Sequence, residues 1–307
     1  MKERILVIRL GALGDLVLCF QAFADIRKAH PDADIALLTT DSFIAFGLQM
    51  PWFDKVLMDR RAPAWRLDRW WQLLHQVRAF APTRIYDLQG KLRQTILYGL
   101  LGGPVGPEWS GAAPLCHLPR LWPPVPGMHF TDFAAAQLQK AGINTGTVVN
   151  TSWLEGGLEG FEFSQRYALL IPGCAPGRPY KRWPVDHYAA LANILYKDGI
   201  AAVAIGAEHD VSVVREIKSV AGHVIDLCGR TNLKQVASLA REAVIVIGND
   251  TGPTHLAAAV GARTLALMSD QVNPLWSAPK GTQTEWLQGK PLATLSVETV
   301  LKTLQIS

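Results

Sequence analysis

The chain has 307 residues, of which 49% are hydrophobic, so it is long enough to bury the cores of two ordinary domains. Its formal net charge of +4 favours anionic ligands but is too small to indicate nucleic-acid binding, so no nucleic-acid partner is expected. The four cysteines form no C-x-x-C pair, which argues against a zinc site or a disulfide framework and predicts a cytoplasmic protein.

The first half of the chain alternates short apolar runs with helical periods, which is typical of a parallel α/β sheet. We predict strands at 4–9, 34–39, 55–57 and 84–88, and helices near 15–29, 66–79 and 91–101. The segment 102–127 is rich in Pro and Gly and predicts ordered loops with room for one short strand, before a helix at about 131–141. No apolar stretch is long enough to span a membrane, so any membrane contact is expected to be peripheral.

The second half repeats the same rhythm of strand, loop and helix. Strands are predicted at 167–171, 201–205, 224–227, 243–247 and 264–268. The expected fold class is therefore α/β, with two doubly wound sheets. In such sheets ligands bind beyond the carboxyl ends of the strands, so functional residues are expected in the loops at that edge.

The loop after the first strand, "LGALGD", contains Gly11 and Gly14 but lacks the Gly-x-Gly-x-x-Gly pattern of dinucleotide-binding folds. Asp15 stands where a phosphate would bind, and its carboxylate would repel a pyrophosphate, which disfavours a dehydrogenase. Two roles stay open for Asp15. It caps the helix that follows, or it takes a proton from a substrate hydroxyl.

A second candidate loop, "GNDTGPTH", follows the strand that ends near residue 247. Asp250 or Thr251 is predicted to cap the next helix, and the backbone N–H groups of Gly252, Thr254 and His255 are predicted to be free to bind a diphosphate. The alternative is an ordinary capped helix in which His255 satisfies a backbone carbonyl.

A third loop, "PGCAPGRPYKRWP", places Arg178, Lys181 and Arg182 between a strand and a helix predicted to start near Pro184. Cations in such a loop are suited to neutralising a departing phosphate. They are equally compatible with solvated surface charges.

The segment 62–80 combines a helical apolar stripe with many arginines. Such a stripe usually faces a core, but the surplus of Trp and Arg also suits contact with anionic lipid. The residues concerned are Leu67, Trp70, Trp71, Leu74 and Val77, with Arg60, Arg61, Arg66, Arg69 and Arg78 nearby.

Five segments together resemble the inverting glycosyltransferases of family 9, the heptosyltransferase type. They are "ILVIRLGALGDLVL", "IYDLQGKLRQT", "LIPGCAPGRPYKRWPVDHYAALA", "LCGRTNLKQVASLAREAVIVIGNDTGPTHLAAAVG" and "SVETVLKTL", which occur in the family's order and span nearly the whole chain. The resemblance implies a GT-B fold of two Rossmann-like domains facing across a cleft. An acceptor-binding domain is expected at 1–155 and a nucleotide-sugar-binding domain at 156–307. Two positions stay open for the last helix, which packs either within its own domain or back on the first one.

The resemblance also implies a transferase that moves a sugar, in the first instance heptose, from an ADP-sugar to a lipopolysaccharide inner-core acceptor at the cytoplasmic face of the inner membrane. Asp15 matches the family's general base, and Lys181 matches the cation on the donor phosphate. Donor binding is implied for Gly14, Arg182, Asp250, Thr251, Gly252, Thr254 and His255, and acceptor binding for Gln89, Lys91 and Arg93. No metal is expected because fixed cations and the helix terminus supply positive charge, and no cofactor besides the ADP-sugar substrate is implied.

Two departures from the family pattern leave the sugar and the acceptor open. The Pro that commonly follows Gly14-Asp15 is missing, and the loop after Met268 lacks a frequent Gly. The alternatives are a family 9 transferase with another sugar nucleotide, a nucleotide-sugar epimerase of the same fold, and a non-catalytic binding protein.

Overall fold

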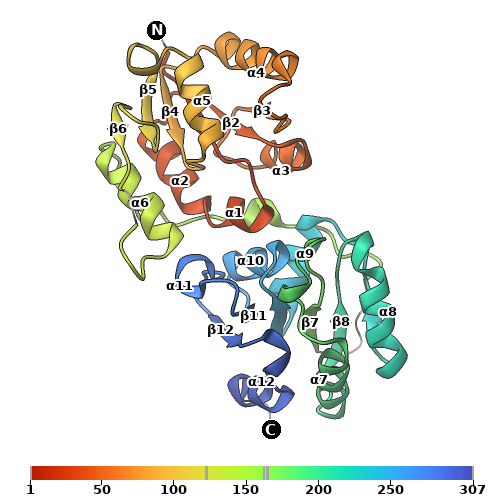
Figure 1. Cartoon of the computed structure of the whole chain (residues 1–307). Coiled ribbons are helices and arrows are strands. Elements are labelled where there is room, and N and C mark those ends of the chain that lie inside the picture. Colours follow the sequence, from red (N-terminus) through yellow and green to blue (C-terminus); the bar gives the residue numbers. More distant parts are fainter. Residues whose placement is uncertain (1, 122–123, 162, 164–165, 306–307) are drawn as a thin grey trace. The chain divides into compact units, whose positions relative to one another are not determined.

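The structure is a computed structural model that describes residues 2–121, 124–161, 163 and 166–305. The chain divides into two compact units, Met1–Trp153 and Leu154–Ser307, each built on a parallel six-stranded sheet (Figure 1). The strand orders are β3-β2-β1-β4-β5-β6 and, read from the other edge, β9-β8-β7-β10-β11-β12. Both units therefore have the Rossmann-like order, which confirms the predicted fold class.

The first unit follows the predicted alternation closely. Its strands are β1 (Arg4–Ile8), β2 (Asp34–Thr39), β3 (Lys55–Met58), β4 (Arg84–Asp87), β5 (Glu108–Gly111) and β6 (Leu118–Pro119). Its helices are α1 (Leu13–Val17), α2 (Phe20–Ala29), α3 (Ile44–Gly47), α4 (Leu67–Phe80), α5 (Leu92–Leu100) and α6 (Phe130–Lys140).

Two predictions for the first unit need correction. The single helix expected at 15–29 is two helices, because the N–H of Cys19 donates to the carbonyl of Leu16 and closes a tight turn between them. The described part of the segment 102–127 contains two short strands, β5 and β6, where room for one was predicted. Both strands pair at the edge of the sheet beyond β4.

The second unit contains one strand that the sequence reading missed. Its strands are β7 (Tyr167–Ile171), β8 (Ala201–Ala204), β9 (Ile225–Asp226), β10 (Ile245–Asn249), β11 (Thr264–Ser269) and the missed β12 (Thr284–Gly289). Its helices are α7 (Val185–Lys197), α8 (Val211–Val220), α9 (Leu233–Glu242), α10 (Gly252–Ala259), α11 (Pro274–Ser277) and α12 (Val297–Leu304). The last helix packs against α7 within this unit, where Val300 and Leu304 join the core.

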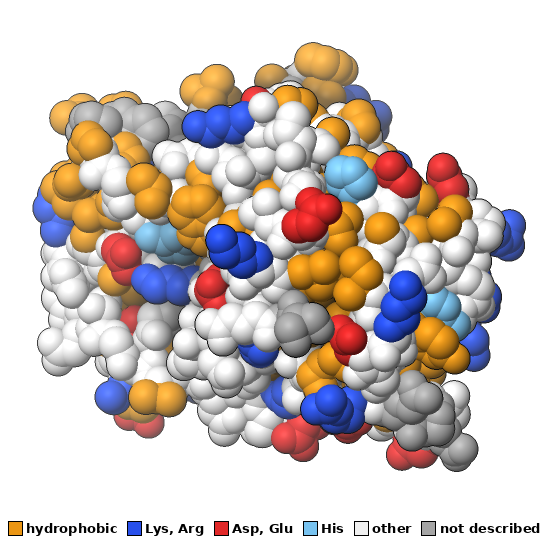
Figure 2. Space-filling model, turned by 90° about the horizontal axis from the view of Figure 1, so that it is seen from below, with side chains coloured by type: hydrophobic (Ala, Val, Ile, Leu, Met, Phe, Trp, Pro, Cys, Tyr) orange, Lys and Arg blue, Asp and Glu red, His pale blue; other side chains and the backbone are white. Residues whose placement is uncertain are grey.

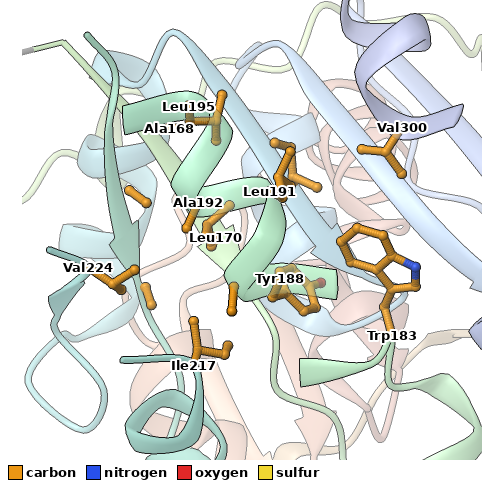
Figure 3. Close-up of a cluster of buried hydrophobic side chains, with 14 of the residues drawn as sticks. Ala168, Leu170, Trp183, Tyr188, Leu191, Ala192, Leu195, Ile217, Val224 and Val300 are labelled. Carbon is orange, nitrogen blue, oxygen red and sulfur yellow. The ribbon is translucent and has the colours of Figure 1, made fainter. Parts of the chain in front are cut away.

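The core of the second unit holds one of the candidate loops in place. Trp183 is fully buried, packs edge-on against Tyr188 with ring centroids 4.9 Å apart, and donates its indole N–H to the carbonyl of Leu295 at 2.8 Å (Figure 3). Since Trp183 comes two residues after Lys181, burial of the indole fixes the end of the loop that carries the predicted cation.

The surface gives two further observations. On the face shown in Figure 2, Lys and Arg side chains lie scattered among Asp and Glu side chains rather than in one basic patch. Within the described ranges, none of the helices has the length and apolarity that a membrane span requires.

Candidate functional site

Asp15 lies in the first turn of α1, directly after the Gly11 turn that ends β1. One carboxylate oxygen accepts a hydrogen bond from the N–H of Ala12 at 3.0 Å, so Asp15 does cap α1. The other oxygen lies 3.1 Å from Nη2 of Arg9, and the side chain remains half-exposed. A carboxylate that is fixed in direction and open to solvent can both cap the helix and meet a substrate hydroxyl.

Arg9 is the buried group that orients Asp15. Its guanidinium also donates to the carbonyl of Leu88 at 2.6 Å and lies 4.4 Å from the centre of the Phe130 ring. These contacts come from the loop after β4 and from α6, so two other elements hold the cation that orients the Asp15 carboxylate. Arg9 could not be singled out from the sequence, because its partners other than Asp15 are 79 and 121 residues away.

Gly11 is required by the backbone and by close packing. Its φ is +94°, and a Cβ at this position would lie 2.3 Å from the Phe43 ring. Gly14, in contrast, is buried inside α1. The predicted Gly turn therefore serves to bring the chain sharply from β1 into α1 and to present Asp15.

The three residues predicted to bind the sugar acceptor follow β4 and differ in their surroundings. Gln89 accepts a hydrogen bond from the N–H of Leu10 at 3.0 Å, which ties this loop to the Asp15 turn. Lys91 is exposed at the start of α5. Arg93 makes a bidentate pair with the buried Asp59, at 2.7 and 2.6 Å, so most of its donors are used inside the unit.

An open hollow of about 560 Å³ lies beside the same edge of the first sheet. Arg61 borders it and donates to the carbonyl of Gly11 at 3.1 Å, which places the hollow next to the Asp15 turn. The sequence reading assigned Arg60 and Arg61 only to the Trp-rich helix, although both come directly after β3. The hollow is lined by Thr40, Asp41, Ser42, Met58, Asp59, Arg60 and Arg61.

Asp87 at the end of β4 is buried, and burial raises its pKa to about 6, although N–H groups of Gly90 and Gln89 donate to one oxygen. The native state thus binds a proton more tightly than the unfolded chain, so stability falls as the pH rises from about 4 to about 6. Relative to an Asp87→Asn variant, the wild type is expected to lose about 2 kcal/mol of unfolding free energy between pH 4 and pH 7, measured by urea denaturation. Equal pH slopes for both proteins would contradict this.

A buried cluster of charged side chains in the second unit joins two of the predicted loops. Nζ of Lys181 lies 2.5 Å from one carboxylate oxygen of Asp250, and Nε2 of His255 lies 3.1 Å from the other. All three side chains are largely buried. Burial alone raises the pKa of Asp250, but the His255 hydrogen bond and the Lys181 charge outweigh it and hold this pKa below its ordinary value.

The predicted diphosphate cradle at the start of α10 needs correction. Thr251 is the N-cap residue, and its carbonyl accepts the N–H groups of Thr254 at 3.0 Å and His255 at 3.1 Å, so these amides are not free. The hydroxyl of Thr254 is also buried, donating to the carbonyl of Asn249 at 2.7 Å. At this turn, the groups that can still contact a ligand are Thr251, Gly252 and the Lys181 cluster.

Asn249 is a site residue that the sequence reading missed. It is fully buried, and its side-chain NH2 group donates to the backbone carbonyls of Pro172 and Gly173 at 2.8 and 3.1 Å. Its side-chain oxygen accepts the backbone N–H of Trp183 at 3.1 Å. It thereby joins the ends of β7 and β10 to the loop before α7. The available signal was an Asn at the end of an apolar strand, where a polar side chain must find buried partners.

Arg182, the remaining residue predicted to bind the sugar donor, contacts a different carboxylate from the Asp250 that pairs with Lys181. Its Nη2 lies 3.8 Å from Asp210, a buried residue at the start of α8. Arg182 and Lys181 are therefore directed to the loops after β8 and β10, the two strands that flank β7 in the sheet.

Similar proteins were found by sequence. The family model described as glycosyltransferase family 9 (heptosyltransferase) matches residues 70–287. Lipooligosaccharide heptosyltransferase 2 of Haemophilus influenzae is 35% identical over 130 residues, which are 38% of this chain and 37% of that protein. The matched part of the chain thus corresponds to little more than a third of the length of this curated relative.

Two solved structures share the fold over nearly the whole chain. The structure of E. coli ADP-heptose lps heptosyltransferase II has a TM-score of 0.76 at 21% identity, covering 99% of this chain and 98% of that one. E. coli heptosyltransferase WaaC with ADP has a TM-score of 0.76 at 18% identity, covering 98% and 99%. These likenesses establish a GT-B fold of two Rossmann-like domains.

Proposed function

This chain belongs to glycosyltransferase family 9, and from that premise we propose that it transfers heptose from an ADP-sugar to a lipopolysaccharide inner-core acceptor. The named relatives act in the same chemistry, since one is a lipooligosaccharide heptosyltransferase and another is an ADP-heptose heptosyltransferase. The first unit binds the acceptor, and the second binds the donor.

The first unit supplies the base. Asp15 takes the proton of the acceptor hydroxyl while that oxygen forms a bond to the anomeric carbon of the donor sugar. The bond from this carbon to the diphosphate breaks, its electron pair leaves with ADP, and the configuration inverts. Arg60 and Arg61 in the hollow, together with Lys91, bind the acidic sugars of the acceptor.

The observation that carries the proposal is the buried Lys181 cluster. Two of the three donors of the Lys181 ammonium reach Asp250, at its carboxylate and at its carbonyl, and the third is available for a phosphate oxygen. A cation held in a largely buried position stabilises the charge that develops on a leaving diphosphate without having to reorganise.

The place of action follows from the acceptor. A lipid-linked acceptor is presented at a membrane, so we place the protein in the cytoplasm, in peripheral contact with the inner membrane.

Isothermal titration calorimetry with ADP, UDP, GDP and NAD tests the donor. We expect selective binding of ADP, because the proposed donor is an ADP-sugar. Preference for UDP or GDP would exclude an ADP-sugar, and binding of NAD alone would overturn the function. Release of ADP from the ADP-sugar only when acceptor is added separates a transferase from an epimerase.

A further inference from the structure

Helix α4 carries a second apolar stripe on the side that faces away from the sheet. Trp70, Leu73 and Val77 lie in the core, as an amphipathic helix requires. On the opposite side Leu67 and Trp71 are 74% and 66% exposed, which is unusual for side chains of this size at helical spacing.

Helix α5 shows the same pattern. Leu97 and Tyr98 are buried in the core of the first unit. Leu92, Ile96 and Leu100 recur every four residues on its outer side and are 75%, 37% and 41% exposed.

The two outer stripes belong to one surface. Near the ends of the two helices, Nη2 of Arg78 donates to the carbonyl of Leu100 at 2.9 Å, and the guanidinium of Arg93 lies 4.2 Å from the Trp70 ring. The helices are labelled in the upper part of Figure 1. We call this surface the α4–α5 face, made of Trp65, Leu67, Trp71, Leu92, Ile96 and Leu100.

Cations outnumber acids around this face. Helix α4, counted from its N-cap residue, carries Arg66, Arg69 and Arg78 against a single acid, Asp68. Helix α5 contains no Asp or Glu. Arg66 and Arg69 flank the face at the start of α4, with Asp68 between them as their ion-pair partner. An occupant of the face must therefore tolerate apolar side chains and carry negative charge.

We propose that the α4–α5 face docks on the surface of an anionic lipid bilayer. The Trp and Leu side chains enter the boundary between headgroups and acyl chains, and the arginines bind lipid phosphates. The proposal deepens the proposed function and rests on it for one reason. Helices α4 and α5 both begin at the carboxyl edge of the sheet that carries Asp15, so docking brings this edge to the surface that would present a lipid-linked acceptor.

Co-sedimentation of the full chain with vesicles tests the docking. Wild-type protein is expected to bind vesicles of phosphatidylcholine with about 30% phosphatidylglycerol at least about tenfold more strongly than vesicles of pure phosphatidylcholine. Addition of about 0.5 M NaCl is expected to weaken this binding, because salt screens the attraction between the arginines and the lipid phosphates. A Trp71→Ser/Leu92→Ser variant should lose at least about tenfold in vesicle affinity. Trp286→Ser is the matched control, because Trp286 is an exposed tryptophan of the second unit.

The outcomes separate docking from catalysis. Transfer to a delipidated, water-soluble acceptor should be unchanged in the Trp71→Ser/Leu92→Ser variant, because neither residue belongs to the site. If no transfer occurs with any protein, the proposed function fails while the vesicle result stands. Equal binding of the variant and the wild type would overturn the docking proposal. So would wild-type self-association that the variant abolishes without any vesicle binding, since the face would then be a protein interface.

Discussion

Replacing Asp15 with Asn is expected to lower the turnover of sugar transfer by about 10²- to 10⁴-fold, because an amide cannot accept the proton of the attacking hydroxyl. The substitution keeps the shape of the side chain, and its carbonyl oxygen can still accept the N–H of Ala12, so α1 retains its cap. Release of ADP at saturating donor and acceptor measures the turnover, and calorimetry with ADP should give an unchanged affinity.

Asp32→Asn is the matched control for this substitution. Asp32 is an exposed acid that precedes β2 and therefore lies at the opposite edge of the same sheet from Asp15. Its variant should transfer sugar at the wild-type rate. An Asp15→Asn protein that retained wild-type turnover would remove Asp15 from the role of base and leave it as a helix cap.

Replacing Lys181 with Met is expected to lower turnover by about 10²- to 10³-fold and to weaken binding of ADP, because the charge on the leaving diphosphate loses a fixed cation. The same change leaves the Asp250 carboxylate buried beside His255 with no lysine. It should therefore also cost about 3–5 kcal/mol of unfolding free energy. Lys197→Met, at the exposed end of α7, is the control for removing a lysine from this unit.

A double variant separates the two effects of Lys181. In Lys181→Met/Asp250→Asn the buried charge is removed together with its partner, so most of the lost stability should return. The turnover should remain low, because no cation has been restored. Recovery of turnover along with stability would show that Lys181 acts only by holding Asp250.

The sequence predicted most strands within one or two residues, because buried parallel strands are short apolar runs between turns. It could not show the break between α1 and α2, since apolar residues continue at helical spacing through Leu16, Val17 and Phe20. β12 was missed for the opposite reason. It lies at the edge of its sheet and exposes residues such as Glu285 and Trp286, so no apolar run marks it.

The loops of the candidate site could be predicted because ligand loops follow strand ends in a doubly wound sheet. Their hydrogen bonds could not. Whether the amides of Thr254 and His255 are free depends on the residue at which α10 begins, and the Thr251 carbonyl captures both of them. The pairing of Arg93 with Asp59 joins residues 34 positions apart, and the spacing in either loop gives no sign of it.

Asn249 has a consequence for the thermodynamics of ligand binding. Its buried amide already fixes the Pro172–Gly173 turn and the backbone before α7, and the Trp183 indole fixes the same segment from the core. The segments around Lys181 thus have little conformational entropy left to lose when a ligand arrives. A preorganised site of this kind spends less of its interaction energy on ordering itself, so a modest number of contacts is sufficient for affinity.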